Sequence, residues 1–506
     1  MSPMQQMLLG SSGGVNAIDF IGMPDPSSAM SGYSAYYQAA YDSKGNIITW
    51  YLHNNFTLVK IKPDGTVDWK RGFSGNPING HTFVALDVGY NDITVCMSYK
   101  ANDGIYLWGV SKTGALLWNK HYHVDNSTYP TAGNTLTFAN NGRSSIKAMT
   151  TGDVALIAVG CNDPSSSNNG TPQLNLLTVK CTDGTSIGWG MSLEAYNKFQ
   201  PDRGFCAYLP SGSTTGYWSA LSEQGYGQSG DASHVKGWRM KGKFYTADHS
   251  GSKDIEIEVV VQGMLRSGSS YAGARQLDYT DCDCLKESTG TNIDSVTTYV
   301  GNQDDATGTY KDGLIINNNW MTWNKKLIHN GNSSSMRVAK KSSDTYFVAC
   351  NDHQTWQDGN TTSYKIVLTK IASNAIVWSR TLLWYAPGTS TQKNVWCNGV
   401  FIDPNGDKGF LNINYNGALT KFIIAQFDTG DTAPATGTYT LSNTGKVTVS
   451  TNSTSLSGTE LISSQQTTYR NHESWYAGHD FEFKTDTWAS QTFEDKSVDF
   501  IKEDWD

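Results

Sequence analysis

Residues 58–71, LVKIKPDGTVDWKR, alternate between the two faces of a predicted strand, turn sharply and continue into a second strand that carries a tryptophan. Proline presets one turn dihedral and glycine accepts positive φ, so Pro63-Asp64-Gly65 predicts a tight reversal between antiparallel strands. Trp69, four residues after Gly65, adds a large apolar plate to the second strand. The pattern therefore predicts a β-hairpin that buries a tryptophan.

Variants of this hairpin recur along the chain. Two apolar strands, DVALIAVGCND (153–163) and DTYFVACND (344–352), each end in Cys-Asn-Asp, and each ends 26 residues before a tryptophan. Two features that keep one interval indicate a true repeat. A Gly or Asn four or five residues earlier marks each of the tryptophans that we predict to pack between repeated sheets: Trp69, Trp118, Trp189, Trp323 and Trp378.

One repeat reads as strand, turn, apolar strand, loop, strand, glycine turn and tryptophan strand. Four antiparallel strands in roughly 40–50 residues, repeated, are the sequence pattern of a β-propeller. We predict an all-β fold, a β-propeller of about seven four-stranded blades, with six or eight as alternatives. The predicted blades are 33–71, 80–121, 144–192, 203–242, 243–328, 336–382 and 396–450.

Both ends of the chain depart from the repeat. The predicted division is an N-terminal docking arm (1–32), the propeller (33–450) and a C-terminal extension with an acidic tail (451–506). The arm has no stable periodicity, and such a segment gains stability by lying on a partner or on its own domain. Its apolar anchors are Met4, Met7, Leu8, Leu9, Phe20 and Ile21. The last 14 residues hold six acidic and two basic residues, which predicts a solvated or partner-docking tail.

Composition supports this interpretation and excludes some functions. Only 17% of residues are charged and 50 are glycine, which suits an all-β protein with many turns. A net charge of −8 argues against a nucleic-acid partner held by phosphate contacts. No run approaches the ~20 apolar residues of a membrane span. The first basic residue is Lys44, so no secretory signal is predicted.

The eight cysteines are too few for a disulfide scaffold at this length. Cys96, Cys161 and Cys350 fall in apolar strands, where free cysteine behaves as a small hydrophobe. We expect reduced thiols and folding in a reducing compartment.

Two short motifs suggest chemistry that their surroundings do not support. A Gly-x-Ser-x-Gly pattern at 10–14 resembles a nucleophile elbow, which needs a strand before it and a helix after it. Asp403-x-Asn405-x-Asp407 begins like a calcium loop, but Lys408 takes the place of the required glycine. A flexible arm and a hairpin turn are the expected structures, and no catalytic residue or metal ligand is predicted.

Acidic residues alternate with cysteines at Asp278, Asp281, Cys282, Asp283 and Cys284. Carboxylates suit hard cations and thiolates suit zinc, so the mixed set favours neither metal. We expect turn residues beside small buried cysteines.

Aromatic residues outside the repeat are the candidates for ligand contact, because loop aromatics can stack on sugars. They are Tyr226, Trp356, Trp384 and Tyr385, although ordinary loop packing is an alternative for each. His121-x-His123 would place two imidazoles on one strand face without a third ligand, and we expect it at a blade edge.

The opening MSPMQQMLLGSSGG resembles the N-termini of tail and fibre proteins of tailed bacteriophages. The tryptophan repeat resembles the blades of quinoprotein-type propellers. The first resemblance implies a structural virion protein of the tail or adsorption apparatus, assembled in the host cytoplasm. Its implied partners are other phage tail proteins, further copies of itself and a host surface glycan or receptor.

Two other functions remain open at this stage. One is a carbohydrate- or receptor-binding propeller module, and the other is a glycan-degrading propeller enzyme that uses loop carboxylates. A quinoprotein dehydrogenase is not expected, since such enzymes typically carry a vicinal disulfide and this chain has no adjacent cysteine pair. No cofactor is predicted.

Overall fold

A computed structural model describes the chain over much of its length. The described residues are 18–22, 39–53, 55–74, 81–100, 104–124, 137–138, 144–162, 172–191, 198–199, 205–223, 237–247, 255–265, 277–285, 295–302, 310–317, 324–328, 332–353, 363–385, 392, 395–415, 422–441, 445–458, 461–462, 483–486 and 492–496.

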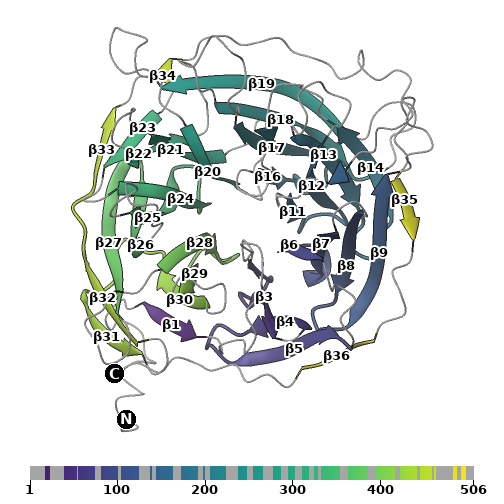
Figure 1. Cartoon of the computed structure of the whole chain (residues 1–506), viewed down its shortest axis with the longest axis horizontal. Helices are drawn as coiled ribbons and strands as arrows, with labels where there is room; N and C mark the ends of the chain where they lie inside the picture. Colours follow the sequence, from purple (N-terminus) through teal and green to yellow (C-terminus); the bar gives the residue numbers. More distant parts are fainter. Residues whose placement is uncertain are drawn as a thin grey trace.

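The described strands form seven antiparallel sheets arranged around a common axis (Figure 1). Each sheet is one blade, and the first strand of a blade lies nearest the axis. The predicted all-β propeller is confirmed, and so is its blade number within the described residues. One 3-10 turn, η1 (Tyr90–Asp92), interrupts the β-structure that they form.

The strands of the first four blades follow chain order. Blade 1 contains β2 (Ala40–Tyr41), β3 (Ile47–His53), β4 (Asn55–Ile61) and β5 (Val67–Phe73). Blade 2 contains β6 (Thr82–Val88), β7 (Thr94–Lys100), β8 (Gly104–Val110) and β9 (Leu116–Val124). Blade 3 contains β10 (Thr137–Phe138), β11 (Ser144–Ala148), β12 (Ala155–Asn162), β13 (Pro172–Val179) and β14 (Ser186–Met191). Blade 4 contains β15 (Lys198–Phe199), β16 (Phe205–Tyr208), β17 (Thr215–Glu223), β18 (Gly237–Tyr245) and β19 (Ile255–Leu265).

The remaining blades complete the ring. Blade 5 contains β20 (Leu277–Cys284), β21 (Ser295–Asn302), β22 (Tyr310–Asn317) and β23 (Asn324–Ile328). Blade 6 contains β24 (Asn332–Lys340), β25 (Thr345–His353), β26 (Ser363–Ala372) and β27 (Ala375–Tyr385). Blade 7 contains β28 (Val395–Ile402), β29 (Lys408–Tyr415), β30 (Phe422–Asp428) and β1 (Asp19–Gly22).

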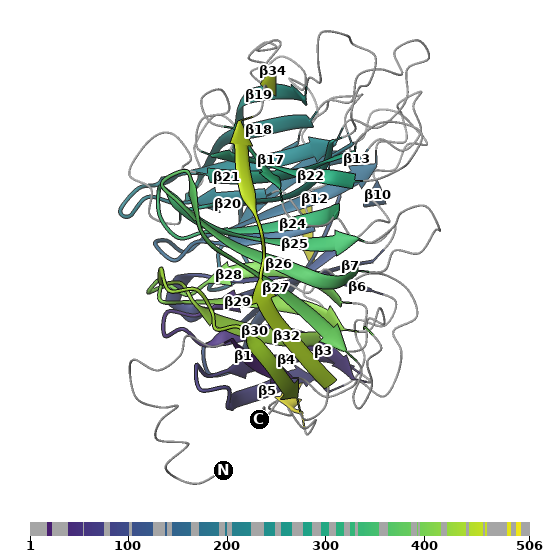
Figure 2. The ribbon, with the colours of Figure 1, turned by 90° about the vertical axis from the view of Figure 1, so that its left-hand side faces the viewer.

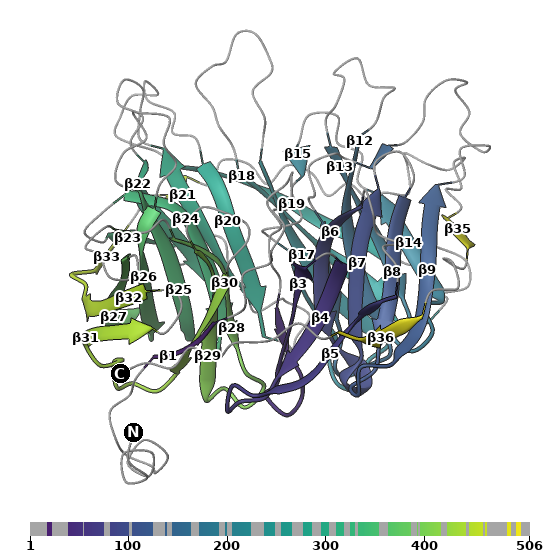
Figure 3. The same ribbon diagram turned by 60° about the horizontal axis from the view of Figure 1, so that its bottom comes forward.

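Tight turns gather on one rim of the ring, which we call the short-turn rim (Figure 3). The predicted turn after β4 is one of them, with the Lys62 N–H donating to the Thr66 carbonyl at 2.8 Å. Gly65 has a φ of +82°, a conformation that glycine adopts without a steric penalty. The opposite rim, where β9, β17, β25 and β27 end, is called the insertion rim.

Both faces of a blade are buried between its neighbours. In β4, Leu58 packs with Trp69 and blade 2, whereas Val59 and Ile61 pack with blade 7. Equivalent apolar clusters fill the spaces between blades 2 and 3, 3 and 4, 5 and 6, and 6 and 7. The alternation of side chains along these strands therefore assigns each residue to one of two neighbouring blades. It does not separate a buried face from a solvent-exposed face.

The repeat tryptophans join one blade to the next. Trp118, on the last strand of blade 2, donates its indole N–H to the Cys181 carbonyl in blade 3 at 2.6 Å. Its ring covers Gly184, where an added Cβ would lie 2.5 Å from the ring. Trp69 and Trp378 make the same type of bond to blades 2 and 7. These three are buried, as predicted; the Trp189 side chain and all of Trp323 lie outside the described residues.

Blade boundaries differ from the prediction in two places. The strand at 255–265 closes blade 4, so the predicted fifth blade began too early. Residues 437–451, predicted to finish blade 7, instead form β31 (Gly437–Leu441) and β32 (Gly445–Thr451), which extend blade 6. No tryptophan hairpin marks the end of either blade, and the sequence therefore gave no boundary there.

The last strand of blade 7 comes from the N-terminus. β1 pairs antiparallel with β30, with Phe20 opposite Ala425 and Ile21 opposite Ile424. Ile18, just before it, is buried in the cluster between blades 6 and 7. Residues 18–22 are thus part of the propeller, which corrects the assignment of Phe20 and Ile21 to a separate arm. The remaining anchors, Met4, Met7, Leu8 and Leu9, lie outside the described residues.

The C-terminal residues form a belt around the outer wall, which Figure 2 shows leaving blade 6. After β32 come β33 (Ser455–Gly458), β34 (Leu461–Ile462), β35 (Phe483–Asp486) and β36 (Phe493–Asp495). They pair with the outer strands of blades 5, 4, 2 and 1, in that order. The described parts of the predicted extension are therefore attached to the ring. Residues 493–495 of the tail, predicted to be solvated or to dock on a partner, pair with blade 1 of the same chain, and residues 497–506 lie outside the described residues.

Six cysteines have described side chains, and all are buried and outside any disulfide: Cys96, Cys181, Cys206, Cys284, Cys350 and Cys397. Among the described residues, no helix is long and apolar enough to cross a membrane.

Candidate functional site

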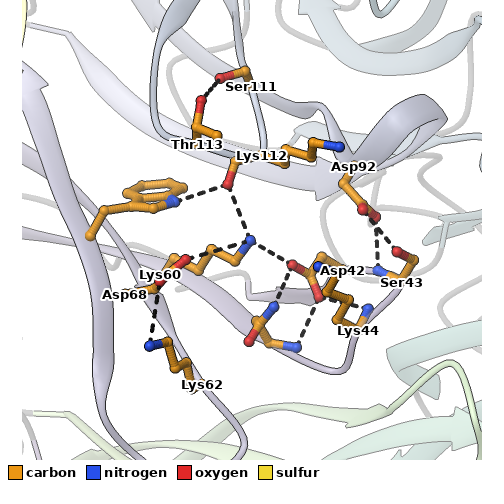
Figure 4. Close-up of polar contacts among 12 residues, drawn as sticks. Asp42, Ser43, Lys44, Lys60, Lys62, Asp68, Asp92, Ser111, Lys112 and Thr113 are labelled. Carbon is orange, nitrogen blue, oxygen red and sulfur yellow. Dashed lines mark hydrogen bonds and ion pairs between the residues drawn. The ribbon is translucent and has the colours of Figure 1, made fainter.

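A buried ion pair lies at the short-turn rim between blades 1 and 2 (Figure 4). Lys60 Nζ is 2.7 Å from Asp42 Oδ2, and the two side chains are 6% and 1% exposed. The Asp42 carboxylate also accepts the backbone N–H groups of Lys44 and Asn46 and the side-chain amide of Asn46. Four donors therefore converge on one carboxylate.

Burial and hydrogen bonding act in opposite directions on Asp42. Burial raises the pKa of the carboxyl, but the bonds from Lys60 and Asn46 outweigh it and leave the pKa below its ordinary value. Asp42 is consequently ionised at neutral pH, and its stable charge suits a structural role better than proton transfer.

The same cluster fastens blade 1 to blade 2. The Lys112 carbonyl, in the turn after β8, accepts both Lys60 Nζ at 3.2 Å and the Trp69 indole N–H at 3.1 Å. Asp92 in blade 2 accepts the Ser43 N–H and hydroxyl, each at 2.8 Å. Figure 4 shows the network around Lys60 and, beside it, the separate Ser43–Asp92 contact.

Blades 6 and 7 repeat the arrangement with different residues. Lys370 Nζ donates to the Thr429 carbonyl and to Asp431, both at 2.7 Å. Trp378, opposite Lys370 in the hairpin, donates to the Gly430 carbonyl at 3.2 Å. In both places a lysine and the tryptophan opposite it donate hydrogen bonds to carbonyl groups of the next blade, so this contact between blades is repeated.

A second polar group, which we call the axial cluster, belongs to the first strands around the axis: Asp87, Lys147, Asp281, Asp283 and Arg337. The first strand of a blade has one edge without a neighbouring strand, so its N–H groups need other acceptors. Asp281 and Asp283 in β20 accept the N–H groups of Val338 and Lys340 in β24, at 3.0 and 2.7 Å. Asp87 accepts the Ala148 N–H of blade 3 at 2.9 Å.

This geometry corrects the expectation that Asp281 and Asp283 are turn residues. They lie in strand β20, and their spacing of two matches the spacing of the N–H groups that point away from β25. Asp278 is in the same strand, but its side chain lies outside the described residues. The alternating acidic residues were visible in the sequence. The N–H groups that they accept belong to β24 in another blade, and the sequence does not show that contact.

Charges of both signs meet in the axial cluster. Burial disfavours a charged Lys147, but Asp87, Asp283 and Asp281 outweigh burial and raise its pKa. Burial raises the pKa of Asp281 to about 6, against the opposing effect of Arg337. Arg337 itself donates to the Asn398 carbonyl of blade 7 at 2.9 Å. Asp281 therefore keeps its proton to a higher pH than an ordinary aspartate does.

Neither cluster resembles a metal centre. Within the described residues, no group of three or more His, Cys, Asp or Glu side chains has the geometry to hold a metal ion. Asp403, the first residue of the calcium-like motif, caps the turn between β28 and β29 and accepts the Lys408 N–H at 3.0 Å. The predicted hairpin turn is confirmed there. The elbow-like pattern at 10–14 lies outside the described residues.

The structure places only two of the four candidate ligand aromatics. Trp384 is fully buried in β27, where β32 covers the strand, so its assignment to a ligand-binding loop was wrong. Tyr385, at the end of β27, is half-buried with Lys446 Nζ 5.0 Å from its ring centroid. Tyr226 and Trp356 lie outside the described residues.

His121 and His123 lie on β9, the fourth strand of blade 2, but this strand is not a free edge of the sheet. β35 pairs outside them, with Asp486 opposite His121 and Lys484 opposite His123. The His121 ring stacks on Tyr106 at 4.2 Å between centroids. The expected blade edge is thus covered by the belt.

The chain matches no protein-family model and no curated protein. Solved structures to which the chain is weakly similar include the subtype N11 neuraminidase-like protein of a flat-faced bat isolate from Peru (H18N11), at 11% identity and a TM-score of 0.30, covering 83% of this chain and 96% of that one. Another is the quinohemoprotein alcohol dehydrogenase of Comamonas testosteroni, at 9% identity and a TM-score of 0.26, covering 86% and 76%. A variant of the GH43 protein BlXynB from Bacillus licheniformis has 8% identity and a TM-score of 0.19, covering 87% and 99%. Similarities this weak carry no argument about the activity of this chain.

Proposed function

We propose that the protein is a structural component of a tailed-bacteriophage virion, placed in the tail or its fibre and adsorption apparatus. In this proposal the propeller is a rigid body, residues 1–17 dock it to another tail protein, and the insertion rim contacts the host surface. The resemblance of the first 14 residues to phage tail proteins is the sequence basis for the proposal.

The single observation that supports it best is the way the N-terminus joins the ring. β1 runs antiparallel to β30, so it begins, with Asp19, at the short-turn rim. Four Gly-, Ser- and Asn-rich insertions join strands that end at the other rim, at 122–143, 222–235, 352–363 and 382–394. If residues 1–17 dock at the short-turn rim, the insertions at the insertion rim stay free to bind a receptor.

The two polar clusters favour a non-catalytic role. The Asp42 pair, the Lys370 contacts and the three axial carboxylates all bind backbone or side-chain groups of a neighbouring blade or turn. Their described contacts hold the ring together, and a catalytic pair would need a free acid or base beside a substrate. We therefore propose a binding and assembly protein, not an enzyme.

The test is to delete residues 2–17 and follow incorporation into particles. The shortened protein, supplied in trans to a phage that lacks the gene, should fold but be missing from purified virions by immunoblot. A full-length chain carrying the exposed substitution Leu117→Ala is the matched control and should be incorporated normally. Normal incorporation of the shortened chain would refute docking through this segment, and absence of the full-length chain from purified virions would refute the virion role itself.

A further inference from the structure

The last belt strand, β36, makes side-chain contacts that the belt's pairing alone does not require. It pairs with β5 on the outer edge of blade 1, with Phe493 opposite Phe73 and Asp495 opposite Arg71. Two flanking backbone bonds extend the pairing: the Ser74 N–H donates to the Thr492 carbonyl at 2.8 Å, and the Lys496 N–H to the Lys70 carbonyl at 3.2 Å.

Phe493 supplies an apolar anchor. Its ring meets Phe73 edge to face, with centroids 5.1 Å apart, and it packs against the cluster between blades 1 and 2. Edge-to-face aromatic pairs favour one relative orientation, so this contact selects an aromatic side chain in one register.

Lys496 supplies a second, more specific contact. Its side chain is only 15% exposed, and Nζ donates to the Phe73 carbonyl at 2.7 Å and approaches Glu494 Oε1 at 3.0 Å. Gly72 provides the space for it: a Cβ added there would lie 2.8 Å from Lys496 Cε and 2.3 Å from the Phe56 carbonyl oxygen. A glycine at this place in a strand marks a close approach by another segment.

Asp495 contributes less to selectivity. It forms an ion pair with Arg71, but its side chain is 80% exposed, and exposed pairs contribute little because water screens them. Phe493 and Lys496, which are partly buried, therefore carry the recognition.

We propose that the outer edge of β5 is a strand-addition site selective for an extended Phe-Glu-Asp-Lys segment. The chain fills the site with its own residues 492–496, and the same segment of a second copy fills it when the first is weakened. Short segments of this kind bind an edge through backbone bonds, with side-chain pockets giving specificity. A covalently attached segment competes at an effective concentration in roughly the millimolar range, which keeps the site closed in the native chain.

The experiment uses the full chain with Phe493→Ala and Lys496→Met, and a fluorescein-labelled peptide of residues 490–497 as the probe. Fluorescence anisotropy should show saturable binding to this variant and binding at least about tenfold weaker to the native chain. A peptide with Lys496→Met should bind about tenfold more weakly than the native peptide, since it loses a charged hydrogen bond. A peptide with Asp495→Ala should stay within about threefold.

Substitutions in the peptide leave the receptor unchanged, so its stability cannot explain their effects. Absence of saturable binding up to about 1 mM, or equal binding of all three peptides, would overturn the proposal. Hydrogen exchange at the Ser74 amide gives an independent readout if the double variant unfolds. In otherwise native chains, Lys496→Met should accelerate this exchange and Asp495→Ala should not; equal effects of the two would also overturn it.

Discussion

Trp118 connects two blades through both its ring and its indole N–H. The ring is 8% exposed and covers Gly184, and the N–H bonds to the Cys181 carbonyl. Trp118→Ala should destabilise the fold by about 3–5 kcal/mol, because it empties a large aromatic site. Denaturant melts measure this, with the neighbouring Leu117→Ala as control, since Leu117 is 46% exposed. A loss below about 1 kcal/mol would mean that the interblade contact contributes little.

Lys60 and Lys62 lie two residues apart and allow a matched comparison. Lys60 pairs with buried Asp42, whereas Lys62 is 48% exposed and 3.7 Å from Asp68. Lys60→Met should cost about 3–5 kcal/mol, because it leaves a buried carboxylate without its cation. Lys62→Met should cost less than about 1 kcal/mol in the same urea melts. Similar losses would contradict a special role for the buried pair.

Asp281 should make the fold less stable as pH rises. Its pKa is raised from the ordinary 3.8 to about 6, so the folded state binds the proton more tightly than the unfolded state. Stability therefore falls between pH 3.8 and about 6, and the full penalty, at most about 3 kcal/mol, applies above that range.

Asp281→Asn keeps an oxygen for the Val338 N–H and removes the charge. It should stabilise the protein at pH 8 and leave stability at pH 4 nearly unchanged. Urea melts at both pH values test this, with exposed Asp407→Asn as the control. A variant that is less stable at pH 8 would show that the charge is needed, through Arg337 and Lys147.

At the scale of elements, the predicted N-terminal arm has two parts with different roles: β1 completes blade 7, and residues 1–17 are the proposed docking segment. Deleting residues 2–17 leaves β1 in place and should leave the melting temperature nearly unchanged. Deleting residues 2–22 also removes Ile18 and the partner of β30, and should cost at least about 2 kcal/mol. Thermal melts followed by circular dichroism compare the two. Equal melting temperatures would mean that β1 contributes no stability to blade 7.

The belt explains how the outer blade edges avoid uncontrolled association. An exposed strand edge is a template for pairing with another chain. Belt strands cover the outer strands of blades 1, 2, 4, 5 and 6, and the belt runs in the direction opposite to blade order. It thereby ties together blades that are far apart in the sequence.

The whole molecule should contain no disulfide. Burial protects the six described cysteines and raises the pKa of the Cys397 thiol to about 12, so little reactive thiolate forms. Mass spectrometry after alkylation should find all eight cysteines as thiols, with these six unreactive until denaturant is added. An intact disulfide between blades would contradict folding in a reducing compartment.

The sequence by itself determined the repeating unit. Turn dihedrals, strand alternation and the interval from Gly65 to Trp69 are local properties, set within about 14 residues, and they hold in the folded ring. It also determined that Asp403 begins a hairpin turn. These features depend on neighbours in the chain, which a single sequence displays directly.

Only the tertiary structure decided what closes and encircles the ring. β1 pairs with β30 some 400 residues away, and the belt strands β33–β36 are two to four residues long, too short for a periodic signal. The role of Asp281 and Asp283 likewise depends on the Val338 and Lys340 N–H groups of the next blade, which these carboxylates accept. Trp384 looked like a loop aromatic because β32, which covers its strand, lies 60 residues further along the chain. Pairing between distant segments follows from the shape of the ring, which no local pattern encodes.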